Sequence, residues 1–187
     1  SREFYCDVIM DEASKMNQMV KNLLTLNQLE FGDEDIVFDR FNLTALVRGV
    51  LQSMEIMADQ AGAKILLHTE EDIYAWADEF KVEQVVKNYV SNACHHVSGD
   101  MVIEVKMVQK DGKVRVSVFN TGTPIPEADI AHIWDKFYKV DKAHTREYGG
   151  NGIGLSIVKA IMDAHNQQYG VKNWENGVEF WFTLDGS

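Results

Sequence analysis

Glycines followed by a helical pattern are the first residues of this sequence whose spacing indicates chemistry. Within the stretch from Tyr148 to Val158, Gly150, Gly152 and Gly154 lead into an apolar run at helical spacing. Glycine tolerates positive φ and lets a backbone lie close to a ligand. A helix that begins there directs free N–H groups and the positive end of its dipole at what lies in front of it. Such an element suits phosphate, although the pattern also fits a hinge.

A second candidate for chemistry is the pair Asn88 and Asn92, which lie four residues apart and so on one face of a predicted helix. Asparagine is a mediocre helix former, and two stacked in mid-helix need a reason. Their amide oxygens are suitable ligands for Mg²⁺, and the alternative is a pair of solvent-facing polar residues. His95 and His96 follow one turn later, and because adjacent residues point in different directions we expect no shared metal site there.

Composition limits the classes of function. The net charge of −11 argues against nucleic acid as the main partner, but it leaves room for a nucleotide held by local lysines and a divalent cation. With 45% apolar residues, the 187-residue chain can form one domain plus an appendage, or two small domains. We find neither an apolar run long enough for a bilayer nor a signal-peptide pattern. Cys6 and Cys94 stand alone and indicate reduced, packing cysteines in a cytosolic compartment.

The first part of the chain predicts one long helix. Its apolar residues recur at spacings of three and four, namely at Ile9, Met16, Met19, Leu23 and Leu26. This period is typical of a bundle or coiled-coil seam, and Gly32 fits a C-terminal cap. One helix cannot bury such a seam alone. We therefore favour one helix of a dimerisation hairpin, the alternative being a helix packed on its own domain.

The remaining chain predicts mixed strands and helices. Apolar runs bounded by turn signals predict strands at residues 36–41, 64–69, 73–77, 101–108, 114–119, 169–174 and 178–184. Asp111-Gly112 and Asn176-Gly177 are predicted hairpin turns, and residues 120–147 are loop-like. The order of elements indicates an α/β two-layer sandwich.

Three helices are predicted after the first one. Asn42 caps a helix whose apolar face reaches Met54, and Asp78 caps a second one. The second helix carries an apolar side that includes Phe80 and runs to Ala93. The third follows the glycine stretch.

Four segments together resemble bacterial sensor histidine kinases. Residues 84–93 (QVVKNYVSNA) look like the asparagine box of that family, and residues 118–126 (VFNTGTPIP) resemble its first glycine box. Residues 133–141 (IWDKFYKVD) are similar to the phenylalanine box, and residues 150–155 (GNGIGL) match the second glycine box. Each motif alone is weak, but the four come in the family's order with family-like gaps.

The resemblance implies a fold and a division of the chain. It implies a Bergerat-type ATP-binding sandwich, in which helices cover one face of a mixed sheet, preceded by one long N-terminal helix. Residues 1–32 would be the second helix of a truncated dimerisation and phosphotransfer hairpin. Residues 33–187 would be the ATP-binding catalytic domain, with a mobile lid between the first glycine box and the glycine-rich helix.

The resemblance also implies roles for individual residues. Asn92 would be the main Mg²⁺ ligand, with Asn88 as its polar support and second ligand. Asn120 stands where most members have an aspartate that reads the adenine amino group, and Gly122 would let the backbone approach the base. Lys139, with a neighbouring lysine at 136 or 142, would meet the γ-phosphate.

Two histidines depart from the family pattern. His95 stands where a phosphate-binding lysine is common, and His96 where an aromatic ring often covers the adenine.

The implied catalytic residues are Asn88 and Lys139. The implied ATP-binding residues are Asn88, Asn92, His95, His96, Asn120, Gly122, Ile125, Phe137, Lys139, Gly150, Gly152, Ile153, Gly154 and Leu155.

The residue at position 88 separates two reaction classes. Related ATPases have a water-activating glutamate there, whereas asparagine cannot act as a general base. The sequence therefore favours phosphoryl transfer from Mg-ATP to a histidine over hydrolysis. None of the six histidines lies on the first helix or precedes an acidic residue. We therefore expect the acceptor to lie outside this chain, which would bind ATP without phosphorylating itself.

The resemblance further implies partners and a location. The cofactors would be ATP and Mg²⁺, and a cognate response regulator would receive the phosphoryl group. The intact protein would form a homodimer through the N-terminal helix, as the cytoplasmic domain of a membrane-anchored kinase. Two alternatives stay open: a hydrolytic ATPase of the same superfamily, and a non-catalytic scaffold whose ATP site has decayed.

Overall fold

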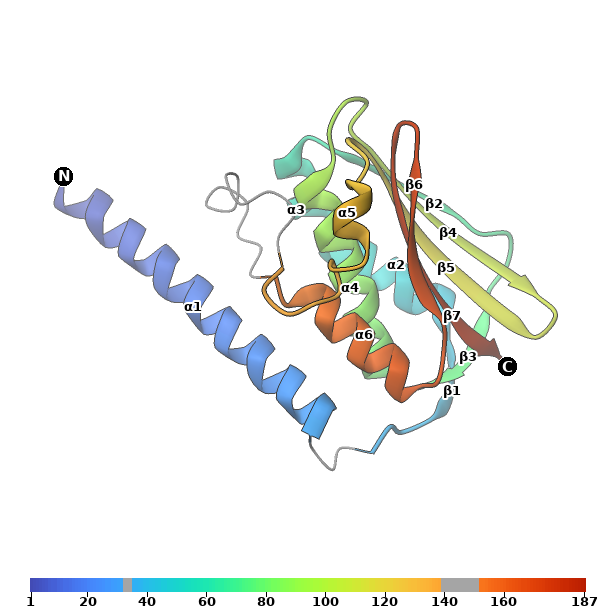
Figure 1. Ribbon diagram of the computed structural model, residues 1–187. Coiled ribbons are helices and arrows are strands. Elements are labelled where there is room, and N and C mark those ends of the chain that lie inside the picture. Colours follow the sequence, from blue (N-terminus) through green and yellow to red (C-terminus); the bar gives the residue numbers. More distant parts are fainter. Residues whose placement is uncertain (32–34, 139–151) are drawn as a thin grey trace.

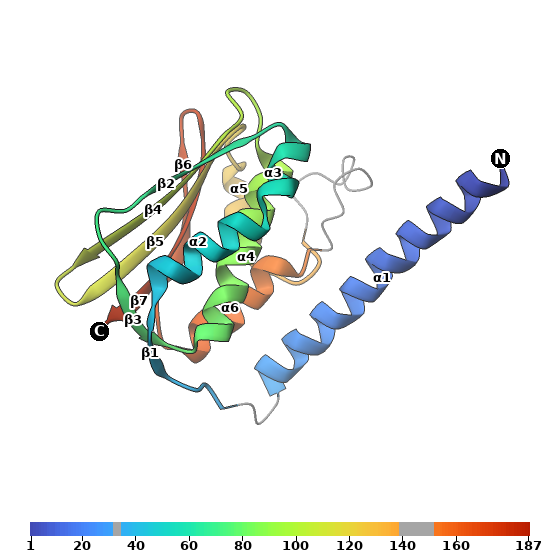
Figure 2. The same cartoon turned by 180° about the vertical axis from the view of Figure 1, so that it is seen from behind.

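The computed structural model describes residues 1–31, 35–138 and 152–187. A long helix lies beside a two-layer unit in which helices cover one face of a sheet (Figures 1 and 2). The helices are α1 (Arg2–Phe31), α2 (Leu43–Ser53), α3 (Glu55–Ala61), α4 (Glu79–His96), α5 (Glu127–Ile130) and α6 (Gly154–Ala164). The strands are β1 (Asp39–Asn42), β2 (Lys64–His68), β3 (Tyr74–Ala77), β4 (Val102–Lys110), β5 (Lys113–Thr121), β6 (Tyr169–Trp174) and β7 (Gly177–Gly186).

The sheet is mixed and confirms the predicted α/β sandwich. Its order is β1-β3-β7-β5-β4-β2, and β6 pairs with β7 off this path. Strands β2 and β4 are parallel, and the other pairs are antiparallel. The predicted hairpin at Asp111-Gly112 joins β4 to β5, with both residues at positive φ as a type I′ turn requires.

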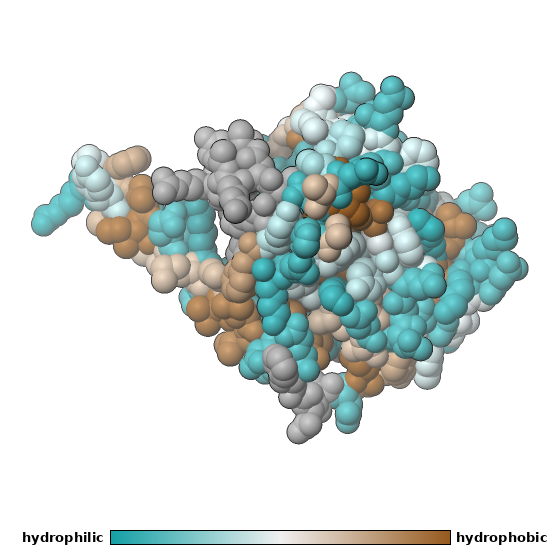
Figure 3. Space-filling view, in the orientation of Figure 1, coloured by the Kyte–Doolittle hydropathy of each residue, from teal (hydrophilic) through white to brown (hydrophobic). Residues whose placement is uncertain are grey.

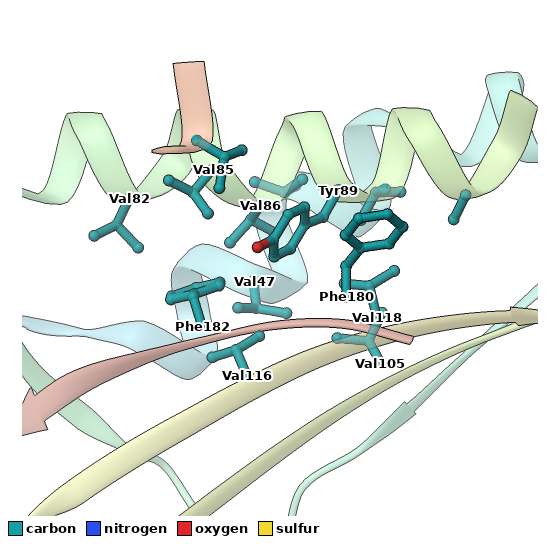
Figure 4. Packing of buried hydrophobic residues seen from close by; sticks show 14 of the residues in the cluster. Val47, Val82, Val85, Val86, Tyr89, Val105, Val116, Val118, Phe180 and Phe182 are labelled. Atoms are coloured by element: carbon teal, nitrogen blue, oxygen red, sulfur yellow. The ribbon is translucent and has the colours of Figure 1, made fainter. Parts of the chain in front are cut away.

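The core lies between the sheet and α4. Every second residue of β5 and β7 is buried and points to the helices, because side chains alternate along a strand. Figure 4 shows Tyr89 of α4 between Phe180 and Phe182 of β7, with ring centroids 5.4 and 6.0 Å apart. The Tyr89 hydroxyl donates to the Trp181 carbonyl at 3.0 Å, and burial raises the pKa of this phenol. The central residue of α4 is thus fixed to the sheet.

The caps of the two predicted helices are confirmed, and Met54 packs against the core as predicted, but the expected place of Phe80 on the apolar face of the second helix is wrong. Asn42 accepts from the Ala45 N–H, and Asp78 accepts from the Lys81 N–H. The first helix ends at Met54, whose φ of −103° and ψ of 6° leave helical geometry, and α3 starts anew after it. Phe80 is 77% exposed, because the first turn of α4 directs this residue away from the sheet.

Several predicted boundaries also differ. The first strand starts at Asp39 rather than residue 36, and β5 continues to Thr121, into the segment expected to be a loop. The last hairpin turns at residues 175–176, since Gly177 already pairs with Trp174 in the ladder. Gly177 packs so closely on β5 that a β-carbon there would lie 2.1 Å from the Asn120 carbonyl oxygen. Cys94 is buried as predicted, whereas Cys6 is exposed.

The long N-terminal helix packs on the domain at one end only. Leu26 is 1% exposed, and Met19, Leu23 and Leu29 pack around it against the core near α6. The N-terminal half of α1 projects away and carries exposed apolar side chains, which Figure 3 shows in brown. Among the described residues, no helix combines the length and apolar character required to cross a membrane.

Candidate functional site

The first part of the site is the contact between α4 and the start of α6. Asn88 is half-buried on α4, and Gly154 is the first residue of α6. A β-carbon at Gly154 would lie 3.1 Å from Asn88 Oδ1 and 3.7 Å from its Cγ. The predicted asparagine and glycine are therefore direct neighbours. Asn92, one turn further along α4, is also half-buried.

The N-terminus of α6 is built to present backbone donors. Ile153 precedes the helix, is fully buried and supplies no side-chain cap. Leu155, next to Gly154, is half-buried and packs against the core. These apolar anchors fix the start of the helix while its first-turn N–H groups receive no capping oxygen from position 153. Such a terminus, beside an amide side chain, suits an anionic ligand.

Gly152 lies against the backbone of Phe137. The Phe137 N–H donates to the Gly152 carbonyl at 2.9 Å, and both residues have positive φ, at 63° and 72°. A β-carbon at Gly152 would lie 2.8 Å from Phe137 Cα. The phenylalanine segment and the glycine stretch, predicted separately, thus meet through backbone contacts, and the Phe137 ring is 50% exposed.

The other end of the site lies where β5 meets the end of α4. Asn120 is 2% exposed and donates from Nδ2 to the Thr121 carbonyl at 3.2 Å. A β-carbon at Gly122 would lie 2.9 Å from the His96 carbonyl oxygen and 3.4 Å from Asn120 Nδ2. The absence of a side chain at 122 therefore allows the loop after β5 to contact α4.

These two glycine contacts define a line along α4. Gly122 contacts the helix at His96, and Gly154 contacts it at Asn88. Eight residues of α-helix span about 12 Å, and Asn92 lies halfway. The candidate site is therefore elongated, with the buried amide of Asn120 at one end and the start of α6 at the other.

The two histidines at the end of α4 contribute neutral groups. Burial is the main cause that lowers the pKa of His95, and the neighbouring His96 adds to it. Desolvation also lowers the pKa of His96, which lies closer to the surface. The lowered pKa values favour the neutral imidazoles, which donate or accept hydrogen bonds, whereas the lysine that is common in the family pattern at position 95 is charged.

Ile125 is held to β6 by an amide that the sequence did not indicate. The Ile125 N–H donates to Asn173 Oδ1 at 3.0 Å, and Asn173 Nδ2 donates to the Ile125 carbonyl at 2.7 Å. Buried Ser156 was also missed: its hydroxyl donates to the Trp134 carbonyl at 3.1 Å and ties α6 to the phenylalanine segment. No sequence signal marks either residue, since a partner strand or loop must first be known.

The structure describes only one of the three predicted lysines. Lys139, Lys142 and Gly150 lie outside the described residues. Lys136 binds Glu30 of α1, with 2.6 Å between Nζ and Oε2. Within the described part of the chain, no three histidine, cysteine or acidic side chains gather as a metal site.

Known proteins are similar to this chain in sequence and fold. Sensor histidine kinase WalK of Bacillus subtilis is 30% identical over 182 residues, which cover 95% of this chain and 30% of the relative. Sensor protein kinase WalK of Staphylococcus saprophyticus is 30% identical over 177 residues, which cover 94% of this chain and 28% of the relative. The chain therefore spans less than a third of these curated relatives.

Solved structures of histidine kinases are also similar to this chain in fold. The catalytic domain of histidine kinase ThkA has a TM-score of 0.70 and 33% identity, over 80% of this chain and 95% of that domain. ThkA in complex with response regulator protein TrrA has a TM-score of 0.77 and 31% identity, over 98% of this chain and 51% of that one. Full-length ShkA in complex with AMPPNP has a TM-score of 0.84 over 98% of this chain and 38% of that one, and at 24% identity it supports the fold alone.

The fold and site define an ATPase-type α/β sandwich. The family model described as "Histidine kinase-, DNA gyrase B-, and HSP90-like ATPase" matches residues 77–187, more than half of the chain. The chain belongs to this family, and within it the relatives named above are sensor histidine kinases.

Proposed function

We propose that this chain is the ATP-binding catalytic domain of a sensor histidine kinase, which transfers the γ-phosphoryl group of ATP to a histidine. The observation that carries the proposal is the contact of Asn88 with Gly154 at the start of α6. It puts an amide, rather than a carboxylate, beside the helix terminus best suited to phosphate. Residues 1–32 would act as a dimerisation-hairpin helix and residues 33–187 as the catalytic domain.

The nucleotide would lie along α4. The adenine would face Asn120, Gly122 and His96, and the phosphates would run past Asn92 toward Asn88 and the first turn of α6. The two ends are separated by eight helical residues, or about 12 Å, which supports an extended nucleotide. His95, Ile125, Phe137 and Ile153 would line the site, as would Gly150, Gly152 and Leu155, and Lys139 would neutralise the γ-phosphate.

The two α4 amides fit a magnesium ion. Mg²⁺ is bound through few protein oxygens and keeps water and phosphate ligands, so Asn92 with support from Asn88 is a sufficient protein contribution. When bound, the ion neutralises phosphate charge. Asn88 and Asn92 would orient the phosphate chain, and the N–H groups of α6 would hold it in place.

The acceptor histidine would come from another segment or chain. Helix α1 contains no histidine, and Asn88 cannot remove a proton from water, so transfer to a protein side chain is favoured over hydrolysis.

A response regulator would then receive the phosphoryl group, as the solved complex of ThkA with TrrA suggests by analogy. The exposed apolar residues of α1 support homodimerisation, and the domain would work on the cytoplasmic side of a membrane-anchored protein.

Calorimetry with Mg-ATP tests nucleotide binding. Wild-type protein should release heat, Asn92→Ala should bind at least about tenfold more weakly, and Asn17→Ala on exposed α1 should match wild type. No heat from wild type would favour the scaffold. Radiolabelled ATP, supplied with a longer form of the same protein that carries an upstream histidine, then separates kinase from hydrolase. Acid-labile labelled protein supports transfer, and release of phosphate without labelled protein contradicts it.

A further inference from the structure

The face of the sheet opposite the helices is not covered by any described element. Helices α2, α4 and α6 lie on one side, and α1 lies beyond them, so the other side of the strands is open in both views (Figures 1 and 2). The strand registers assign the residues of this outer face, because partners across a ladder point to the same side. Trp181, Ser117 and Lys106, for example, form one row across β7, β5 and β4.

Aromatic residues are concentrated on this outer face. Three of the four tryptophans lie there, together with a tyrosine and a phenylalanine. These residues are Tyr74, Trp76, Phe119, Trp174 and Trp181. Trp76 and Trp174 are each 46% exposed. An open face that carries so many large aromatic side chains differs from an ordinary solvated surface.

A cationic side chain of the same face lies over each of three aromatic rings. The Arg115 guanidinium lies 4.2 Å from the Trp181 ring centroid, and the Lys172 ammonium lies 4.0 Å from that of Trp174. Arg40 lies 4.0 Å from the Tyr74 ring. Such stacking immobilises both partners without removing the positive charge.

The central tryptophan is also fixed from below. A β-carbon at Gly170 of β6 would lie 2.7 Å from Trp181 Cζ2, so the indole lies flat on a strand that has no side chain at that position. With Gly170 beneath it and Arg115 against it, Trp181 loses little freedom when a partner covers it. Preorganised aromatic anchors of this kind lower the cost of association.

The charge of the outer face is opposite to that of the chain. Its positions carry seven cations: Arg40, Lys64, Lys106, Lys110, Lys113, Arg115 and Lys172. They carry three carboxylates: Glu104, Glu179 and Asp185. Seven against three gives a formal charge of +4, whereas the whole chain carries −11. The carboxylates are already engaged, with Lys106, the Trp174 indole and Lys113.

We propose that this outer face of the sheet is a docking surface for an acidic segment of a partner protein. Carboxylates of the partner would meet Arg115, Lys106 and Lys172, and an apolar side chain would cover Trp181. Tryptophan, tyrosine and arginine are the residues that dominate protein interfaces. A nucleic acid is the less favoured occupant, because a duplex carries one negative charge about every 1.7 Å along its length and would extend beyond the cationic face onto the acidic remainder of the chain. A short acidic segment can stay on the cationic face. The surface lies across the sheet from the α4–α6 site and is independent of the proposed function.

A short peptide rich in Asp and Glu with one Leu is the probe. In ¹H–¹⁵N NMR spectra we expect it to shift the indole N–H signals of Trp181 and Trp174, with an affinity that falls as salt rises. The double variant Lys106→Glu/Arg115→Glu should weaken binding about tenfold or more. Lys15→Glu on α1 makes a charge change of the same kind far from the sheet and should bind as wild type does. Mg-ATP calorimetry of each variant checks that the other side of the sheet is intact.

Three results would overturn the proposal. One is the absence of indole shifts at millimolar peptide, and another is peptide binding that the double variant retains. The third is a preference of the same face for oligothymidylate, or for a second copy of the chain in sedimentation, over the acidic peptide.

Discussion

Gly154 and Asn88 lie so close that a β-carbon at 154 would be 3.1 Å from Asn88 Oδ1. A real β-carbon at this distance would be tighter than an ordinary van der Waals contact, so the Asn88 amide occupies the space that a side chain at position 154 would need. The contact joins two segments that are 66 positions apart in the sequence. It explains why a glycine begins the helix, although glycine is a poor helix former.

The first prediction concerns this contact. Gly154→Ala should weaken Mg-ATP binding about tenfold, because the new methyl group displaces the Asn88 amide from its position beside the helix start. Calorimetry measures the loss. In the Asn88→Ala background the same change should cost much less, since the group that it displaces is gone. Equal losses in both backgrounds would mean that the contact does not position Asn88.

The second prediction uses two glycines as a matched pair. Gly177→Ala should destabilise the protein by about 3 kcal/mol or more, because its methyl group would lie 2.1 Å from the Asn120 carbonyl in a packed ladder. Gly49→Ala on α2 meets nothing within 4 Å and should stabilise by about 0.5–1 kcal/mol. Urea unfolding of both variants measures the difference, and a stable Gly177→Ala protein would contradict the close packing.

Local signals predicted much of the fold. The Asp111-Gly112 turn and the Asn42 and Asp78 caps are confirmed, because each depends on side-chain or backbone chemistry within four residues. Gly177 was assigned to the turn, since Asn-Gly is the usual hairpin pair, whereas its glycine is needed for contact with β5. Phe80 was assigned to the core from its period, but the period does not say where a helix first meets the sheet.

The site could be predicted only as separate motifs. The resemblance supplied Asn88 and Gly154, and the structure adds that they touch. Asn173 holds Ile125 from 48 positions away, a distance at which no sequence pattern acts. The cationic aromatic face was missed altogether, because its residues are spread over seven strands and alternate with core residues.

The third prediction is a loss of stability in acid that depends on His165. This residue is 5% exposed. Its Nε2 accepts from the Asp78 N–H at 3.1 Å, and its Nδ1 lies 2.8 Å from the Ile161 carbonyl. Burial is the largest cause that lowers the pKa of His165, and Lys81 adds to it, while the Ile161 carbonyl and Asp78 oppose it.

The direction of the pH dependence of stability follows from the lowered pKa of His165. The unfolded chain binds the proton more tightly than the folded one, so the contribution is present above the unfolded pKa of about 6.5. It is lost as the pH falls below that value toward the lowered folded pKa. His165→Gln keeps one acceptor and one donor but cannot titrate, so its melting temperature should fall less on acidification than that of wild type. His95→Asn is a second variant for comparison, because burial also lowers the pKa of His95. If the melting temperatures of wild type and His165→Gln fell in parallel with pH, His165 would not be the residue responsible.

The fourth prediction is that one substitution at Asn120 raises the affinity for Mg-ATP and lowers the stability of the free protein. Asn120→Asp should strengthen Mg-ATP binding, because a carboxylate accepts a hydrogen bond from the adenine amino group more strongly than a neutral amide does. The nucleotide-free protein should melt at a lower temperature, since the side chain is 2% exposed and the donor to the Thr121 carbonyl is lost. Calorimetry and thermal melts measure the two effects, and a variant with weaker ATP binding would remove Asn120 from the adenine end.

The fifth prediction separates two of the contacts between α1 and the domain. Leu26 is 1% exposed, so Leu26→Ala should cost about 2–4 kcal/mol of the docking free energy. The Glu30–Lys136 pair has side chains that are 31% and 42% exposed, and Glu30→Gln should cost less than about 1 kcal/mol. Hydrogen exchange along α1 and α6 reads the docking directly, since an undocked helix exchanges faster even where the domain stays folded. If Glu30→Gln released α1 as fully as Leu26→Ala, the ion pair rather than the apolar contact would determine how the helix is seated.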